Sequence, residues 1–305
     1  MKNLTVGIFN DEELGALLGK RGTDTDIRMF NRKENDIIYT FMHPVKGRPV
    51  PKSQIMSAIN AAIVSFEKQT PELGESILML DAAGISQGVA IVPEGINVKS
   101  VIGMTKGTSL EGFVMLPRDQ HRIIEALSKM HAERDSAGPA SVIIDQAFSV
   151  RGVGEVALGF VKTGTVKRHQ KLMHMQAGKE VVIRSIQMHD KDFEEAGIGS
   201  RVGLAVKGVT AEEMKRGTVL SENGVYMLAD NVKLEFRENR FYGGAKEGKF
   251  HATVGMQSFP VELSFDDGKA VAKADRKVAY RKGETFFLLD LNAEKVHLIG
   301  SGRPL

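Results

Sequence analysis

The part of the chain that begins at Ser141 consists of short β-rich runs separated by glycine-containing turns. The first series reads SVIIDQAFSV, GEVALGFV, GTVKRHQKLMHM, KEVVIRSIQMH and SRVGLAVKGV, and a second series follows Gly224. The second series contains no helix-like segment. This cadence is typical of closed antiparallel barrels. The sequence therefore predicts two successive β-barrels, over residues 137–222 and 223–305.

The first part of the chain, residues 1–136, alternates strands with helices instead. Predicted strands are Leu4–Phe9, Asp26–Asn31, Ile37–Met42, Ala61–Phe66, Gly88–Val92 and Glu111–Leu116. Predicted helices are Glu12–Leu18, Ser53–Asn60, Glu72–Ala83 and Asp119–Glu133. Thr70 and Pro71 suit the start of the third helix, and Gly84 suits its end. The alternation predicts a doubly wound α/β domain whose sheet is mostly parallel.

Composition narrows the classes of protein that remain. A chain of 305 residues with 42% hydrophobic and 26% charged residues is ordinary for a soluble protein of two or three domains. No run approaches the roughly 18 apolar residues of a membrane helix, and we expect no secretory leader before Leu4. Cysteine is absent, which excludes disulfides and thiolate metal sites. We expect a cytoplasmic protein with no membrane partner and no metal.

The stretch VGIFNDEELGALLGK, residues 6–20, begins like a phosphate-binding strand–loop–helix unit. Such a unit needs G-x-x-x-x-G-K-S/T, whose backbone N–H groups surround the phosphates. Here Asn10, Asp11, Glu12 and Glu13 follow the strand almost directly. A helix N-terminus attracts anions, and carboxylates at this end satisfy it and repel a triphosphate. We therefore expect these acidic residues to cap the helix in place of a phosphate.

The middle domain resembles the second domain of translational GTPases, the elongation factor Tu family. The matching residues are AFSVRGVGEVALGFVKTGTVKRHQKL, VVIRSIQMHDKDFEEAGIGSRVGLAVKGV and TAEEMKRGTVL. The third domain, in KFHATVGMQSFPVEL and VHLIGSGRPL, is similar to that of SelB, the selenocysteine-specific elongation factor. The resemblance implies that residues 1–136 correspond to the GTPase domain of this family.

The motifs of a GTPase are missing from these residues. Aligning Pro44 with the proline of D-x-P-G-H puts Met42 in place of the aspartate near Mg²⁺ and Lys46 in place of the catalytic histidine. The base-reading N/T-K-x-D motif does not follow Gly88–Val92, and Thr105–Thr108 imitates it without the aspartate. We therefore predict that the protein is not an enzyme, binds no GTP and has no cofactor, so that the site at Asn10–Glu13 is degenerate.

The resemblance also implies an RNA partner, because the second domain of the family holds the aminoacylated 3′ end of tRNA and the third grips its stem. The segment that lies against the terminal adenosine corresponds here to 186–190, where Gln187 and His189 keep the ability to stack and to bond. Asp190 replaces a cation, which does not suit a phosphate. The candidate partner is tRNA or another structured RNA, with the ribosome or a translation factor as a further partner.

Basic residues in both barrels are the other candidates for RNA contact. They are Lys167, Arg168 and Lys171 in the first barrel, and Arg240, Arg276, Lys277, Arg281 and Lys282 in the second. Strand alternation in RKVAYRK puts Lys277 and Arg281 on one face. The small net charge of +3, with its basic excess after residue 136, is compatible with a polyanion but does not demand one. Lysines on strands also commonly protect sheet edges from aggregation.

Three hypotheses follow. In the first, the protein is a GTP-independent, translation-associated protein that binds structured RNA through its barrels. In the second, it is a pseudo-GTPase scaffold whose α/β domain binds a ribosomal or translation protein. In the third, it is an atypical elongation factor that still binds GTP. No catalytic constellation of Ser, His and Asp can be assembled from the sequence.

Overall fold

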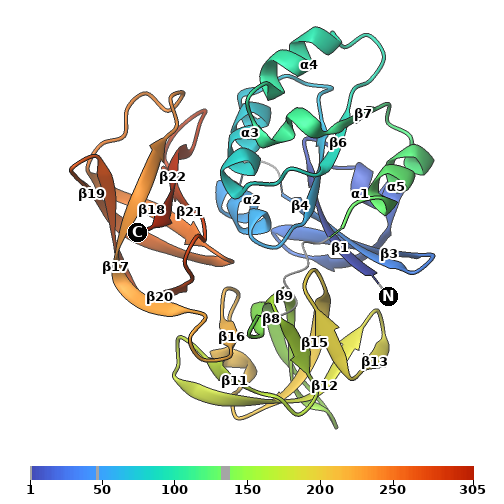
Figure 1. Ribbon diagram of the computed structural model, residues 1–305, viewed down its shortest axis with the longest axis vertical. Coiled ribbons are helices and arrows are strands. Elements are labelled where there is room, and N and C mark those ends of the chain that lie inside the picture. The colour runs from blue at the N-terminus through green and yellow to red at the C-terminus, as the bar shows by residue number, and fades with distance from the viewer. Residues whose placement is uncertain (1, 46–47, 132–137) are drawn as a thin grey trace. The chain divides into compact units, whose positions relative to one another are not determined.

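The computed structural model describes residues 2–45, 48–131 and 138–305 (Figure 1). The predicted fold class is confirmed, since an α/β domain with a mixed sheet precedes two antiparallel β-barrels. The described residues form two compact units. The first contains the α/β domain together with Arg237–Ala245 and Phe287–Ser301, and the second contains the remaining residues. The predicted domain boundary at 136–137 lies outside the described residues, and the boundary at 222 stays a prediction.

The α/β domain is a seven-stranded sheet in the order β2-β3-β4-β1-β5-β6-β7. Strands β4, β1, β5, β6 and β7 are parallel, and β2 and β3 are antiparallel additions at one edge. Figure 1 shows α2 and α3 on one side of this sheet and α1 and α5 on the other. The elements are β1 (Lys2–Phe9), α1 (Leu14–Leu18), β2 (Lys20–Asp24), β3 (Ile27–Glu34), β4 (Ile37–Pro44), α2 (Pro49–Met56), β5 (Ala61–Ser65), α3 (Pro71–Ala83), β6 (Gly88–Ile91), α4 (Val98–Thr105), the 3-10 turn η1 (Ser109–Gly112), β7 (Val114–Leu116) and α5 (Gln120–Ser128).

Alternate residues of β1 build the core beneath α1 and α5. Leu4, Val6 and Ile8 belong to one buried cluster with Leu14 and Leu18 of α1 and with apolar residues of α5. Each such side chain contributes about 1.5–3 kcal/mol through removal of apolar surface from water. The helix α1 lies very close to the sheet, because a Cβ added at Gly15 would meet the Phe30 ring at 2.3 Å. This packing holds α1 against the sheet, next to the site described below.

Several predicted boundaries of the α/β domain are wrong. The first helix starts at Leu14 rather than Glu12, the second runs over Pro49–Met56, and the strand predicted from Glu111 starts only at Val114, after η1. Strand β2 and helix α4 were not predicted. The hairpin of β3 and β4 and the helix α3 are confirmed. Thr70 accepts a hydrogen bond from the Leu73 N–H at 3.3 Å, as a cap, and Gly84 ends α3 in the left-handed conformation at φ 71°.

The first barrel is closed by the pairing of β11 with β12, in the cyclic order β11-β16-β8-β9-β15-β12. Its longest strands are antiparallel neighbours. In β12, the buried side chains are Val181, Ile183, Ile186 and Met188, which face the inside of the barrel. A bulge between Ile183 and Ser185 shifts the alternation of inward and outward side chains. The elements are β8 (Ser141–Val150), β9 (Gly154–Thr163), β10 (Thr165–Lys167), β11 (Lys171–His174), β12 (Lys179–Met188), β13 (Lys191–Phe193), β14 (Glu195–Gly197), β15 (Arg201–Lys207), the 3-10 turn η2 (Ala211–Glu213) and β16 (Val219–Ser221).

The second barrel is closed in the order β17-β20-β19-β18-β21-β22. Its elements are β17 (Met227–Glu238), β18 (Gly248–Val254), β19 (Gln257–Asp266), β20 (Lys269–Tyr280), β21 (Phe286–Leu289) and β22 (Leu298–Pro304). Strand β21 is buried along its whole length, from Phe286 to Leu289. Over the described part of the chain, no helix has the length and apolar character needed to cross a bilayer.

Candidate functional site

A cleft of about 660 Å³ lies where β1 and β4 end and the loops after them begin. Strand β1 is central, with parallel neighbours β4 and β5 on its two sides. In open α/β sheets, ligands bind outside the carboxyl ends of the strands at such a point. The cleft is lined by Phe9, Asn10, Asp11, Glu12, Glu13, His43, Pro44, Lys52, Glu67, Lys68, Thr70, Glu72, Ser76 and Arg118.

The connection from β1 to α1 consists of Asn10, Asp11, Glu12 and Glu13 alone. Asn10 makes the sharp turn in the left-handed conformation, with φ at 68°. Its side-chain Nδ2 donates to the backbone oxygens of Ser65 at 3.2 Å and of Lys68 at 3.0 Å, which anchors the turn. Asparagine tolerates this conformation better than most residues. A connection this short has no room for the longer glycine-rich loop that surrounds a phosphate.

The carboxylate of Asp11 occupies the start of α1. Its Oδ1 accepts hydrogen bonds from the N–H groups of Glu13 at 3.1 Å and Leu14 at 2.9 Å. Arg118, at the start of the segment before α5, donates to both oxygens, with Nε at 2.7 Å from Oδ2 and Nη2 at 3.2 Å from Oδ1. Asp11 is thus a fixed anion at the position expected for one, and its hydrogen bond raises the pKa of Arg118.

The two neighbouring carboxylates do not cap the helix, in contrast to the expectation for all three. Glu12 lies 3.6 Å from Arg28 of β3, and the Glu13 side chain is exposed. Both still line the cleft. In the described structure, the carboxylate of Asp11 alone accepts the two side-chain hydrogen bonds at the start of the helix, from the N–H groups of Glu13 and Leu14. Glu12 thus pairs with Arg28 instead of capping the helix, and both acids add negative charge to the cleft.

The residues that align with the metal-binding and water-activating motif do not all lie in the cleft. Met42 is completely buried in β4, in the core of the sheet, and it does not line the cleft. Lys46 lies outside the described residues. His43, which stands between the two, is buried at 4% exposure and does line the cleft. Its Nδ1 lies 3.0 Å from the Ile8 carbonyl oxygen, and burial lowers its pKa.

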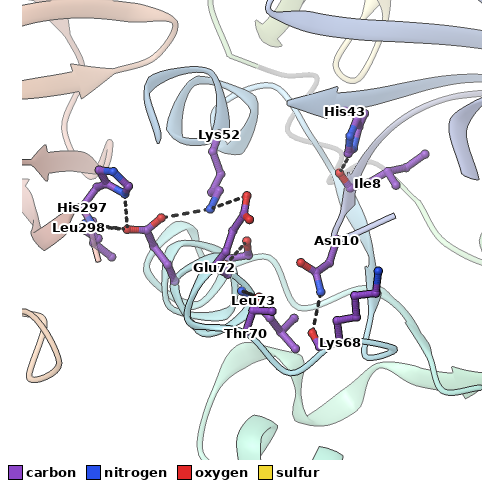
Figure 2. A network of polar contacts seen from close by, with 12 residues as sticks. Ile8, Asn10, His43, Lys52, Lys68, Thr70, Glu72, Leu73, His297 and Leu298 are labelled. Carbon is purple, nitrogen blue, oxygen red and sulfur yellow. Dashed lines mark hydrogen bonds and ion pairs between the residues drawn. The ribbon is translucent and has the colours of Figure 1, made fainter. Parts of the chain in front are cut away.

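A buried ionic network that the sequence did not predict lies beside the cleft (Figure 2). Lys52 of α2 donates to Glu75 Oε2 at 3.1 Å, and its Nζ lies 3.8 Å from Glu72 Oε1. Glu75 Oε1 accepts from the backbone N–H groups of His297 at 2.6 Å and Leu298 at 2.8 Å. A buried carboxylate with three donors is well satisfied. Glu75 and His297 are 222 residues apart in the chain, so no local pattern marks their contact.

The basic candidates of the first barrel are exposed but partly engaged. Arg168 donates to Glu194 at 3.1 Å and to the Arg184 carbonyl, and Lys171 pairs with Glu180 at 3.0 Å. Exposed pairs of this kind hold their partners weakly. Lys167 and Arg168 line a shallow hollow of about 590 Å³, so the structure does bring these two together.

Gln187 and His189 lie at one end of the first barrel. Gln187 is exposed on β12 and donates to Asp192 at 2.9 Å. His189 and Asp190 form the turn to β13, both in the left-handed conformation, with φ at 49° and 58°. The turn presents the His189 ring to solvent, which suits stacking. Asp190 is exposed beside it, so the local charge opposes a phosphate.

The basic candidates of the second barrel do not share one face as predicted. Val278, Ala279 and Tyr280 are all buried, so the simple alternation fails at this end of β20. Pairing with β17 shifts between Ala229 and Asn231, and such an irregularity changes which side chains face inward. Arg281 is half-buried as a result, whereas Lys277 and Lys282 are exposed.

Two other arginines, Arg276 and Arg240, lie over aromatic rings. The Arg276 guanidinium lies 5.8 Å from the Phe259 ring and donates to the Ser258 carbonyl at 2.8 Å. The Arg240 guanidinium lies 4.8 Å from the ring of Phe241, which is 61% exposed. An exposed arginine on an exposed ring is a suitable platform for a base.

A second unpredicted cluster of charges surrounds Lys162 of β9. Burial, with Arg281 nearby, lowers the pKa of Lys162 to about 8, and burial raises the pKa of Glu284. The Tyr226 phenol is buried in the same place, and its pKa is raised, mainly by that burial. The cluster explains the half-buried position of Arg281, which interacts electrostatically with Lys162 and Glu284.

Comparison with known proteins agrees with this architecture. The family model "Elongation factor Tu domain 2" matches residues 154–221. The uncharacterized protein MJ0325 of Methanocaldococcus jannaschii is 37% identical over 309 residues, which cover 99% of this chain and 100% of that protein. The selenocysteine-specific elongation factor of the same organism is 30% identical over 178 residues, which cover 57% of this chain and 37% of that factor.

Solved structures share the fold at low sequence identity. Elongation factor SelB from Methanococcus maripaludis, in complex with the GTP analogue GPPNHP, matches with a TM-score of 0.82 at 20% identity, covering 100% of this chain and 79% of that one. A bacterial selenocysteine-specific elongation factor matches with a TM-score of 0.84 at 17% identity, covering 100% of this chain and 59% of that one. This chain therefore belongs to one family with MJ0325, and it contains a domain of the elongation factor Tu domain 2 family over residues 154–221.

Proposed function

We propose that the protein acts in translation by binding tRNA or another structured RNA through its two barrels, and that it does so without GTP. The family gives the translation-related role. The observation that supports GTP independence is the carboxylate of Asp11, which accepts from the N–H groups of Glu13 and Leu14 and is clamped by Arg118. A phosphate seated there would have to displace this carboxylate and approach Glu12 and Glu13. On this proposal the protein is a cytoplasmic, non-enzymatic member of its family.

Exposed cations and rings of the barrels support the RNA half of the proposal. Lys277 and Lys282 are exposed on the second barrel, and Arg240 lies over the exposed ring of Phe241. Lys167 and Arg168 share a hollow on the first barrel. Cations of this kind bind phosphates, and each phosphate contact makes the affinity more dependent on salt. Gln187 and His189 stay candidates for contact with a nucleotide base.

Titration of RNA over a range of salt concentrations tests this half. Total tRNA should shift in an electrophoretic assay with the intact protein at low salt, and the shift should weaken as salt rises. The double variant Lys277→Glu and Lys282→Glu should weaken binding by about tenfold or more and flatten the salt dependence, because two phosphate contacts are lost. Lys106→Glu, on the α/β domain, is the matched control. The absence of a shift at low salt in the unmodified protein contradicts the proposal.

Calorimetric titration with GTP and Mg²⁺ tests the other half. We expect no heat of binding for the unmodified protein. Binding at micromolar concentration would refute GTP independence and favour the reading of the chain as an atypical GTP-binding factor. The RNA titration is independent of this result, so the two halves of the proposal can fail separately.

A second candidate function is a scaffold in which the α/β domain contacts a protein of the translation apparatus. The observation in its favour is exposed apolar surface. Val98 and Ile102, one turn apart on α4, are 48% and 49% exposed, and Val114 and Met115 of the edge strand β7 are 45% and 38% exposed. Purification of the tagged protein from a nuclease-treated lysate distinguishes the two functions. A translation protein that remains bound after RNA removal favours the scaffold, and its loss after Ile102→Glu would locate the contact.

A further inference from the structure

Phe241, in the connection between β17 and β18, has the most exposed aromatic side chain of the described structure. The residue is 61% exposed, and among the described large apolar residues only Leu305, at 65%, is more exposed. A single exposed apolar residue is common on protein surfaces. Phe241 differs from such residues because the chain on both sides of it is anchored and because a guanidinium lies beside its ring.

The turn that carries Phe241 is anchored by hydrogen bonds. The Phe241 N–H donates to Asn239 Oδ1 at 3.0 Å, and the buried Asn239 side chain donates to the Leu298 carbonyl oxygen at 2.8 Å. The next residue, Tyr242, donates its O–H to Asp290 Oδ2 at 2.7 Å and its N–H to the Asn239 carbonyl oxygen at 2.9 Å. The residues on both sides of Phe241 are therefore fixed, and the outward position of its ring is a property of the fold.

The guanidinium of Arg240 places a positive charge next to this ring. It lies 4.8 Å from the centroid of the Phe241 ring, and Arg240 is exposed, with no ion pair recorded for it in the described structure. The carboxylates near the turn accept other hydrogen bonds: Glu238 accepts from the Ala245 N–H at 2.6 Å, and Asp290 accepts from the phenol already described. The charge of Arg240 is therefore available to an anion such as a phosphate.

The chain just after the ring leaves space for a ligand. Gly243 and Gly244 have positive φ, at 96° and 106°, and a Cβ added at either would meet no atom within 4 Å. No side chain of these two residues can therefore cover the ring. Leu291, which follows Asp290, is 46% exposed, so an apolar protein contact is the alternative that the experiments below must separate.

We propose that Phe241 and Arg240 bind one unpaired nucleotide of the RNA partner, with the base stacked on the ring and a phosphate paired with the guanidinium. An aromatic face beside a cation is complementary to a nucleotide, which carries both a π-face and a negative charge. In a duplex each base is stacked between its neighbours, so only a nucleotide in a loop, in a bulge or at an end can stack on a protein ring. This inference rests on the RNA binding proposed above, and it adds that the RNA is not recognised through its duplex parts alone.

Tryptophan fluorescence tests the stacking directly, because the natural chain contains no tryptophan. In the intact protein, Phe241→Trp introduces a single reporter at the site. Total tRNA, and a short RNA duplex with a single-stranded overhang, should quench its emission at low salt, whereas the same duplex with blunt ends should leave the emission unchanged. Leu17→Trp, at a position on α1 that is 39% exposed, is the matched control and should not respond. Equal quenching by the overhang and blunt duplexes, or bound tRNA without quenching, would overturn the proposal.

Affinity measurements separate stacking from ordinary apolar contact. Phe241→Leu keeps an apolar side chain without a π-face, and it should lower the affinity for the overhang duplex by about tenfold, whereas Phe241→Trp should retain it. Unchanged affinity in Phe241→Leu would contradict the proposal. A protein that stays with the tagged chain in a nuclease-treated lysate, and is lost from Phe241→Ala, would assign the ring to a protein contact instead.

Failure of this inference is distinct from failure of RNA binding as a whole. If the unmodified protein shifts tRNA at low salt but Phe241→Leu shifts it equally and Phe241→Trp is not quenched, only the nucleotide site at Phe241 is refuted. If the unmodified protein shifts no tRNA and no overhang duplex, the RNA proposal is refuted, and this site with it.

Discussion

At the scale of single residues, the carboxylate of Asp11 connects distant parts of the α/β domain. It accepts from the Glu13 and Leu14 N–H groups and holds Arg118, which lies 107 residues later in the chain. One carboxylate therefore fixes the beginning of α1 and ties it to the segment before α5. The sequence predicted the capping role, because the residue follows a strand and precedes a helix. It could not predict Arg118, since no periodicity connects positions so far apart.

The variant Asp11→Ala should lower the free energy of unfolding by about 1–3 kcal/mol, because it removes a helix cap and leaves Arg118 without its acceptor. Glu13→Ala is the matched control: this carboxylate is exposed, and its loss should change stability by less than about 0.5 kcal/mol. Urea denaturation followed by circular dichroism measures both. Equal effects of the two variants would show that neither the helix cap nor the ion pair with Arg118 contributes to stability.

Glu75 is the other residue whose removal should have a large effect. Its side chain is 2% exposed and that of its partner Lys52 is 5% exposed, so either charge alone is poorly solvated. Glu75→Gln should destabilise the protein by about 3 kcal/mol, because it leaves the buried ammonium without its main partner. Adding Lys52→Met should restore part of that loss. Urea denaturation of the single and double variants checks this, and strictly additive losses would contradict the pairing.

At the scale of elements, the sequence was most informative where a local signal defines a boundary. Thr70 and Gly84 delimit α3 correctly, and the polar turn after β3 defines its hairpin with β4. Strand β2 was missed because its residues, KRGTD, carry no apolar alternation; it exists through backbone pairing with β3 at an exposed edge. The face of β20 was predicted wrongly because a shift in pairing is a property of two strands and cannot be read from one.

Turns of the first barrel allow a test at the same scale. Gly208 follows β15 at φ 103°, and a Cβ added there would lie 2.4 Å from the Glu180 carbonyl oxygen. Gly178 also has positive φ, at 65°, but a Cβ there meets open space. Gly208→Ala should therefore destabilise the protein by about 3 kcal/mol, and Gly178→Ala by about 1 kcal/mol. Thermal denaturation of the two variants gives the comparison, and similar melting temperatures would rule out the close approach.

At the scale of the whole molecule, the half-buried charges around Lys162 should make stability depend on pH. The folded-state pKa of Lys162 is about 8 and its ordinary value is 10.5, so between these values the unfolded chain binds more protons than the folded one. The free energy of unfolding should therefore rise with pH from about 8 towards 10. Glu284 and Arg281 face the same group, and the raised pKa of Tyr226 opposes the trend only above pH 10.

Lys162→Met should remove this rise, because the variant has no proton to lose in that window. Lys167→Met, at an exposed position near the end of the same hairpin, should retain it. Urea denaturation at pH 8, 9 and 10 measures the slope. A slope that is the same in Lys162→Met and in the unmodified protein would assign the dependence to other groups.

The architecture of the whole chain could be predicted from the sequence. Apolar runs separated by glycine turns indicate barrels, and alternating strands and helices indicate a parallel sheet. The cleft was accessible only in part. Its acidic side could be read at Asn10–Glu13, whereas His43, Lys52 and Arg118 reach it through packing that brings β4, α2 and the segment before α5 to one place.

The anion at the start of α1, the carboxylate of Asp11, is covalently part of the polypeptide. This affects how fast it meets its N–H partners and how far their contact depends on concentration. A dissolved phosphate arrives and departs at rates set by its abundance, but a tethered carboxylate meets its N–H partners at the same effective concentration however dilute the solution becomes. A dissolved anion that competes for the N–H groups of Glu13 and Leu14 must displace the Asp11 carboxylate, which cannot diffuse away. The start of the first helix is therefore held by a carboxylate of its own chain, whatever the concentration of the protein.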